Sequence, residues 1–277
     1  MPVATHTSDK EAKPVRHIIA LSGGKDSSAL AVYLRGKIPN VEYVFCDTGE
    51  ELDETYEYLG LLEAFLGKKI QWLKSIKDFK FYLDMYKGVL PDAQTRWCTR
   101  MLKLKSYEQY IGDDEVVSYV GIRADEPHRT GYISTKPNIK AVFPFIENNI
   151  RHADVVRILE EAGLGLPKYY SWRSRSGCYF CFFQQKREWI GLLENHPDLF
   201  EKAKAYEKVD PVTGERYTWN QGESLDELAQ RADEIKADYL KRKERNALAF
   251  KGHQKLKDVW GDGADSGEAI ACTICHL

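Results

Sequence analysis

The sequence predicts an α/β protein with a doubly wound, mainly parallel sheet and a C-terminal helical extension. Three observations support this prediction. In the first half, short and continuously apolar segments alternate with amphipathic segments, the order that builds parallel strands joined by right-handed helical crossovers. Three of the apolar segments end in polar turns. From about residue 148 onward the patterns are helical.

The first strand and helix are predicted around the stretch HIIALSGGKDSSALAVYL. HIIAL is apolar without alternation, as in a strand that is buried on both faces, and the helix is expected over residues 27–37. The second strand runs from Val41 to Cys46, and Gly67 closes the amphipathic helix after it. EVVSYV, starting at Glu115, supplies a third strand.

Ligands of such sheets bind beyond the carboxyl ends of the strands. The polar turns at Ser22, Asp47 and Arg123 all follow strand segments. We therefore expect these turns to converge on one crevice.

The chain divides into four predicted regions. Residues 1–14 form a flexible tail, residues 15–165 the α/β domain, residues 166–260 a C-x-x-C segment with helices, and residues 261–277 a mobile Gly- and Asp-rich tail with a second C-x-x-C. Within the second half, helices are predicted over residues 152–164, 184–209 and 224–250.

Composition narrows the function classes. The 277 residues are 43% hydrophobic, enough to bury a sizeable core, and the formal net charge of -2 gives no overall attraction to nucleic acid. No stretch reaches the length of a membrane span and the polar start lacks the apolar core of a secretory signal, so we expect a cytoplasmic protein. Six cysteines with two C-x-x-C pairs indicate metal or redox ligands rather than disulfides.

The turn after the first strand has the composition of a phosphate site. It consists of Ser22, Gly23, Gly24, Lys25, Asp26, Ser27 and Ser28. The glycines allow successive N–H groups to point into one concavity at a helix N-terminus, the serines add hydroxyl donors, and the lysine adds a positive charge. The aspartate can order the loop or approach a metal ion. The spacing differs from the Walker A and G-x-G-x-x-G patterns, and the alternative is an ordinary capped turn.

These residues carry a family resemblance. S-G-G-x-D-S after an apolar strand resembles the pyrophosphate (PP) loop of the N-type ATP pyrophosphatases, and FCDTGEELDET resembles the D-T-G-x-x-x-x-E-T stretch of the phosphoadenosine phosphosulfate (PAPS) reductase family. GIRADEPHR resembles that family's G-I-R-x-x-E segment, and FPFIENN its P-L-I-E-W stretch. The motifs span roughly residues 17–185 and imply the adenine nucleotide alpha hydrolase-like (HUP-type) fold.

The resemblance implies ATP and Mg2+ as ligands and a set of residues that hold them. Nucleotide-binding positions outside the loop are Asp47, Thr48, Gly121, Arg123, Glu126 and Arg129, and Glu54 and Thr55 stand at further motif positions. Asp47 would bind a ribose or the magnesium ion, while the arginines suit phosphate or sulfate oxygens. The catalytic set would be Lys25, Asp26, Ser27 and Arg123. Ordinary turns and a surface ion pair are the alternatives.

The cysteines form a second candidate site. Cys98, Cys178 and Cys181 can hold an iron–sulfur cluster or zinc, or they can be uncoordinated thiols. Their segments resemble those of the cluster-bearing adenylylsulfate reductases and of the DNA-phosphorothioation enzymes of DndC and SspD type, which implies a [4Fe-4S] cluster. Cys275 or Cys272 could be a fourth ligand, or one iron could stay open. Trp97 replaces the first cysteine of the reductases' vicinal pair, and Cys46 is expected in the core.

Basic residues surround these cysteines. They are Arg96, Arg100, Lys103 and Lys105 near Cys98, and Arg173, Arg175, Lys186 and Arg187 near the central C-x-x-C. Such charge suits a phosphate-bearing substrate or lowers thiol pKa values.

The resemblance is greatest to the phosphorothioation enzymes and implies an ATP pyrophosphatase. ATP would adenylate a DNA phosphate oxygen, and sulfur would then displace AMP. The expected partners are a cysteine desulfurase as sulfur donor, DNA and other phosphorothioation proteins. No association with a membrane is expected. The alternatives are an adenylylsulfate or PAPS reductase, a tRNA thiolation enzyme and a non-catalytic nucleotide sensor. The residues leave open the acceptor, the choice of iron or zinc, the fourth ligand and the oligomeric state.

Overall fold

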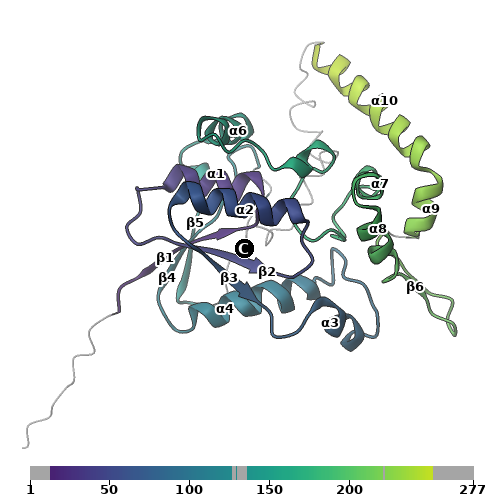
Figure 1. Cartoon of the computed structure of the whole chain (residues 1–277), viewed down its shortest axis with the longest axis horizontal. Coiled ribbons are helices and arrows are strands. Elements are labelled where there is room, and N and C mark those ends of the chain that lie inside the picture. The colour runs from purple at the N-terminus through teal and green to yellow at the C-terminus, as the bar shows by residue number, and fades with distance from the viewer. Residues whose placement is uncertain (1–12, 127–128, 130–135, 221, 252–277) are drawn as a thin grey trace, which may run out of the picture.

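The computed structural model describes residues 13–126, 129, 136–220 and 222–251, with the side chains of residues 246–251 excepted. Its centre is a five-stranded sheet of order β3-β2-β1-β4-β5, in which every neighbouring pair is parallel (Figure 1). The strands are β1 (Arg16–Leu21), β2 (Glu42–Asp47), β3 (Ile70–Lys74), β4 (Val116–Tyr119) and β5 (Ile139–Val142). The predicted α/β class with a doubly wound parallel sheet is confirmed.

Both faces of the sheet are covered. The helices α1 (Lys25–Leu34), α2 (Asp53–Leu66) and α6 (His152–Glu161) lie on one face, and α4 (Lys105–Ile111) lies on the other (Figure 1). Alternate residues of β1 enter the two cores, with Ile19 and Leu21 on the first side and Ile18 and Ala20 on the second. Burial on both faces explains why β1 and β2 are continuously apolar.

The two edge strands, β3 and β5, were not predicted. β3 is largely exposed, with Ile70 its one buried residue, and β5 has only four residues. An edge strand has few buried positions, so its sequence carries little apolar signal.

The second half is helical but more divided than predicted. Its elements are α5 (Pro144–Glu147), the 3-10 helix η2 (Lys168–Ser171), α7 (Lys186–Asn195), α8 (Pro197–Lys204), α9 (Leu225–Gln230) and α10 (Ala232–Lys251). Pro197, which has no N–H to donate, starts α8 and splits the helix predicted over residues 184–209. A short hairpin, β6 (Lys208–Val209) with β7 (Arg216–Tyr217), lies where no strand was expected.

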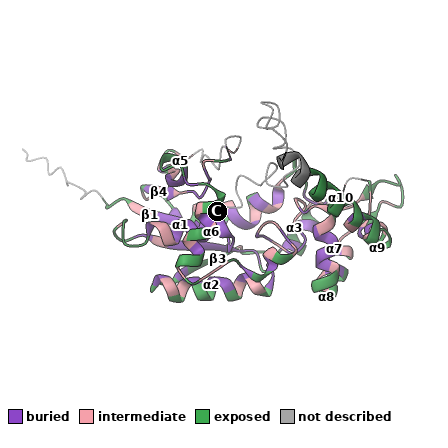
Figure 2. Ribbon diagram, turned by 90° about the horizontal axis from the view of Figure 1, so that it is seen from above, coloured by how far each residue is buried: buried purple, intermediate pink, exposed green. Residues whose placement is uncertain are grey.

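The C-terminal helices pack against α3 (Phe79–Met85) and the π-helix η1 (Thr99–Leu104). The ring of Phe79 lies 4.3 Å from that of Phe180 and 5.1 Å from that of Trp97, and Trp219 stacks on Phe180 at 5.1 Å. Figure 2 shows buried residues in the strands and exposed residues on α9 and α10. This aromatic core therefore joins residues on both sides of position 165. The domain boundary expected at that position stays a prediction.

Within the described ranges, the longest helices are too short or too polar to cross a lipid bilayer.

Candidate nucleotide site and cysteine pocket

Both glycines of the loop after β1 are required by close packing. Gly23 has a φ of 70°, and a Cβ placed on it would lie 2.5 Å from Thr55 Cγ2 of α2. A Cβ on Gly24 would lie 2.6 Å from the hydroxyl oxygen of Ser176. The loop is therefore held between α2 and the segment that precedes the C-x-x-C.

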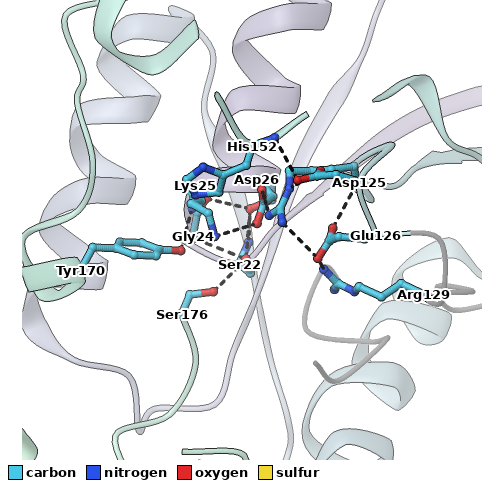
Figure 3. Close-up of polar contacts among 12 residues, drawn as sticks. Ser22, Gly24, Lys25, Asp26, Asp125, Glu126, Arg129, His152, Tyr170 and Ser176 are labelled. Carbon is cyan, nitrogen blue, oxygen red and sulfur yellow. Dashed lines mark hydrogen bonds and ion pairs between the residues drawn. The ribbon is translucent and has the colours of Figure 1, made fainter. Parts of the chain in front are cut away.

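Serine hydroxyl groups hold the loop in shape. The Ser22 N–H donates to Ser27 Oγ at 3.1 Å, and the Ser27 hydroxyl lies within 3.3 Å of the Gly24 carbonyl oxygen, to which it donates. The Ser176 hydroxyl donates to Ser22 Oγ at 3.1 Å (Figure 3). Because α1 begins at Lys25, its N-terminal N–H groups and the positive end of its dipole lie at this loop. The arrangement can bind a phosphate group.

Two tyrosines of η2 cover the loop. The Tyr169 hydroxyl donates to the Gly23 carbonyl oxygen at 2.7 Å. The Lys25 N–H donates to the Tyr170 hydroxyl at 3.1 Å, and Lys25 Nζ lies 5.2 Å from the centre of the Tyr170 ring (Figure 3). The tyrosines therefore contact the backbone at the positions where a phosphate would be recognised.

Charged residues join the loop after β4 to the start of α1. The Arg123 side chain is 2% exposed and contacts three carboxylates: Asp26 at 2.9 Å, Asp125 at 3.0 Å and Glu126 at 3.6 Å. Arg129 contacts Glu126 at 2.5 Å. In addition, Lys25 Nζ lies 3.4 Å from Asp26, and a Cβ on Gly121 would lie 3.1 Å from the Asp26 carbonyl oxygen. The predicted phosphate-binding cations are thus gathered between β1 and β4, where the connections change direction as they do at the ligand site of doubly wound sheets.

Asp47 lies at the carboxyl end of β2 but in a separate group of contacts. It accepts hydrogen bonds from the Gly49 N–H and the Tyr56 hydroxyl, both at 2.9 Å, and pairs with Lys74 at 3.0 Å. Burial raises the pKa of this carboxyl, but these donors outweigh it and hold the pKa below its usual value. The contacts of the described residues give Asp47 no hydrogen bond or ion pair to the phosphate loop. Glu54, a neighbouring motif position, pairs with His196 at 2.9 Å.

The two cysteines of the central C-x-x-C and the cysteine that precedes η1 share one cavity. Cys98, Cys178 and Cys181 line it together with Thr48, Lys103 and the aromatic residues Phe180, Phe182, Phe183 and Trp219. We call this cavity the cysteine pocket. Thr48 Oγ1 lies 3.2 Å from Cys178 Sγ, so the turn after β2 forms one wall of the pocket. Burial raises the pKa of the Cys178 thiol well above its usual value, and the negative charge of the nearby Glu51 raises it further.

Arg173 holds the C-x-x-C backbone. Its guanidinium is buried and donates to the carbonyl oxygens of Gly177 at 3.1 Å and Cys178 at 2.7 Å. Cys46 lies in the core as expected, where burial raises the pKa of its thiol to about 12.

The three thiols around the cysteine pocket are donors of the kind that both zinc and iron–sulfur clusters take. In the part of the chain that the structure describes, no three His, Cys, Asp or Glu side chains come close enough to hold one ion. Cys272 and Cys275 lie outside the described residues.

Trp97, which replaces the reductases' first cysteine, is a core residue. Its indole donates to the Val89 carbonyl oxygen at 3.1 Å and stacks on Tyr86 at 5.0 Å. This position therefore supplies packing rather than a ligand.

Sequence reasoning missed the residues that connect the two sites. They are Tyr169, Tyr170 and Ser176, which contact the phosphate loop, and Glu51, which contacts Thr48 and Cys178. The only local signal was the position of Ser176, two residues before the C-x-x-C.

The chain is similar to proteins of known sequence and structure. Residues 16–182 match the phosphoadenosine phosphosulfate reductase domain. An uncharacterised protein of Methanocaldococcus jannaschii is 28% identical over 230 residues, which are 78% of this chain and 45% of that protein, so the chain spans less than half the length of this relative.

Two solved structures resemble the chain. The phosphoadenylyl-sulfate (PAPS) reductase of Candida auris in a phosphate complex has a TM-score of 0.48 and 13% identity, and covers 61% of this chain and 84% of its own. The U34-tRNA thiolase NcsA of Methanococcus maripaludis with its [4Fe-4S] cluster has a TM-score of 0.41 and 16% identity, and covers 79% of this chain and 82% of its own.

Proposed function

The chain belongs to the phosphoadenosine phosphosulfate reductase domain family, and from that premise we propose that it is an ATP pyrophosphatase coupled to sulfur transfer. One observation carries the proposal: the segment of residues 169–181 contacts both sites. Its Tyr169 and Ser176 bond to the phosphate loop, and two residues further Cys178 enters the cysteine pocket. The two candidate sites are therefore joined by one short segment of the chain.

The phosphate loop would bind the β and γ phosphates of ATP. Lys25 and a bound Mg2+ ion would neutralise the leaving pyrophosphate, and Arg123 would bind the α phosphate. Arg123 is held in place by three carboxylates, so little reorganisation is needed when charge develops. Asp26 positions both cations, since it contacts Lys25 and Arg123.

The reaction would then have two steps. An acceptor phosphate oxygen attacks the α phosphorus of ATP, the α–β bond breaks and pyrophosphate leaves. A sulfur nucleophile next attacks the acceptor phosphorus, and AMP leaves with the oxygen. We propose DNA as the acceptor, for phosphorothioate modification, and a cysteine desulfurase as the source of the sulfur, with a thiol reductant that cleaves the S–S bond of its persulfide and releases the sulfide that attacks.

A [4Fe-4S] cluster held by Cys98, Cys178 and Cys181 would supply an iron position that can bind sulfide when the fourth ligand is absent. If the cluster has a fourth protein ligand, we propose that it is Cys275. The chain's own contribution is the buried pocket and Arg173, which orients the peptide groups at Cys178.

The test is release of AMP and pyrophosphate by anaerobically purified protein. We expect pyrophosphate from ATP and Mg2+ with DNA present and AMP once sulfide is also supplied, and we expect Lys25→Ala to lose both products. Lys37→Ala is the matched control, because Lys37 is exposed and follows the C-terminal end of α1, whereas the phosphate loop lies at its N-terminal end.

Other outcomes would overturn the proposal. Sulfite release from adenylylsulfate or PAPS without pyrophosphate would identify a reductase. Pyrophosphate release that requires tRNA would identify a tRNA thiolation enzyme, and ATP binding without cleavage would identify a nucleotide sensor.

A further inference from the structure

Two arginines stack on one aromatic ring at the cysteine pocket. The guanidinium carbon of Arg96 lies 5.1 Å from the centre of the Phe183 ring, and that of Arg175 lies 5.3 Å from the same centre. Phe183 in turn lies 4.3 Å from Phe182, and both phenylalanines line the pocket. We call Arg96, Arg175, Phe182 and Phe183 the arginine rim.

The arginine rim brings together two distant segments. Arg96 precedes Cys98, the ligand candidate before η1, and Arg175 precedes the C-x-x-C. All four rim side chains are half-buried, so they are neither core residues nor freely solvated ones. Positive charge and aromatic surface are thus combined beside the candidate sulfur site.

The charge of the rim is not neutralised locally on the Arg96 side. Among the residues that the structure describes, Arg96 donates to the Ala93 carbonyl oxygen and forms no ion pair with a carboxylate. The neighbouring Arg100 is exposed and likewise has no carboxylate partner in the described ranges. A structural arginine is normally paired, so this side has the composition of a binding surface for an anion.

We propose that the arginine rim binds a single strand of DNA and presents it to the cysteine pocket. This inference rests on the proposed function, which requires a nucleic-acid acceptor, and it adds where that acceptor binds. A guanidinium stacked on an aromatic ring can still offer its N–H edge to a phosphate, and unstacked bases pack on aromatic and guanidinium planes. A duplex hides its base faces, so the aromatic part of the rim favours a strand that is already unpaired.

Binding of a fluorescently labelled DNA oligonucleotide, measured by anisotropy without ATP over a series of salt concentrations, tests the rim. Arg96→Ala with Arg175→Ala should weaken binding at least tenfold and reduce the slope of log K against log salt by about 1.4, from about 0.7 for each lost phosphate contact. Arg96→Lys with Arg175→Lys should keep the slope but still weaken binding, because lysine keeps the charge and loses the planar stack.

The chain offers a matched control. Arg35 also stacks on an aromatic ring, with its guanidinium carbon 4.6 Å from the centre of Phe65, and Lys37 lies 3.5 Å from the centre of Tyr33. Both follow the C-terminal end of α1, away from the phosphate loop at its N-terminal end. Arg35→Ala with Lys37→Ala removes the same charge and should leave DNA binding unchanged.

The outcomes separate this inference from the proposed function. Equal loss of binding in the rim and control variants, or tighter binding of duplex DNA or tRNA than of the single strand, would overturn the rim as a site for single-stranded DNA. Rim-dependent binding by a protein that releases no pyrophosphate would uphold the rim and reject the pyrophosphatase. Pyrophosphate release by a protein whose DNA binding does not depend on the rim would uphold the pyrophosphatase and reject the rim.

Discussion

Replacing Gly23 by alanine should destabilise the protein through two separable effects. The positive φ of 70° costs an L-residue about 1–2 kcal/mol. The new Cβ would also lie 2.5 Å from Thr55 Cγ2, and Thr55 is buried in α2, so relieving the overlap should cost about 1–3 kcal/mol more. The sum is about 2–5 kcal/mol, enough to lower the free energy of unfolding substantially.

Urea unfolding of a double-mutant cycle separates the two effects. Thr55→Ser removes the methyl group and keeps the hydroxyl, so in that background Gly23→Ala should cost only the about 1–2 kcal/mol of the backbone conformation. Gly36→Ala is the control for the same term, because Gly36 has a φ of 73° and nothing within 4 Å of its new Cβ. An equal cost of Gly23→Ala in both backgrounds would refute the contact, and no cost in either would refute the left-handed conformation.

Three further predictions concern charge and thiols. Arg16 donates two hydrogen bonds to Glu42 and thereby holds the pKa of that carboxyl below 4.5, against the effect of burial. Because the pKa of Glu42 is lower in the folded than in the unfolded state, the stabilisation is present above the unfolded pKa and is lost as the pH falls through the folded pKa. Glu42→Gln should therefore lower the free energy of unfolding by about 1–3 kcal/mol at pH 7. In urea unfolding at several pH values, this difference from the wild type should shrink below about pH 4. A difference that is constant with pH would contradict this. Cys178→Ser should lower the iron and sulfide content of anaerobically purified protein while Cys46→Ala leaves it intact, and equal contents would reject the ligand assignment. Arg123→Ala should lower the free energy of unfolding by about 1–3 kcal/mol, because Asp26 and Glu126 each lose one of two cationic partners, and an unchanged free energy of unfolding would contradict this role of Arg123.

The strand–loop–helix units at the centre of the sheet could be predicted because their signal is local. β1 and β2 are buried on both faces, so their sequences are continuously apolar, and the loop after β1 carries its small and charged residues in one stretch. The same holds for the C-x-x-C, whose two thiols come from a single turn. Burial of a strand and the conformation of a turn restrict residues that are neighbours in the chain. These restrictions can therefore be recognised in a single sequence.

What only the tertiary structure decided depends on contacts between residues far apart in the chain. Tyr169 reaches Gly23 across 146 positions, and Ser176 reaches Ser22 across 154. The half-exposed edge strand β3 and the stacking of Arg96 on Phe183 likewise follow from how separate segments pack. A tyrosine or arginine has the same local pattern in a loop whether it faces water or a buried backbone, since the free energy that places it comes from its partner. The amino-acid sequence by itself therefore determined which residues form the two candidate sites, the loop after β1 and the cysteines, and tertiary packing decided that the segment of residues 169–181 contacts both.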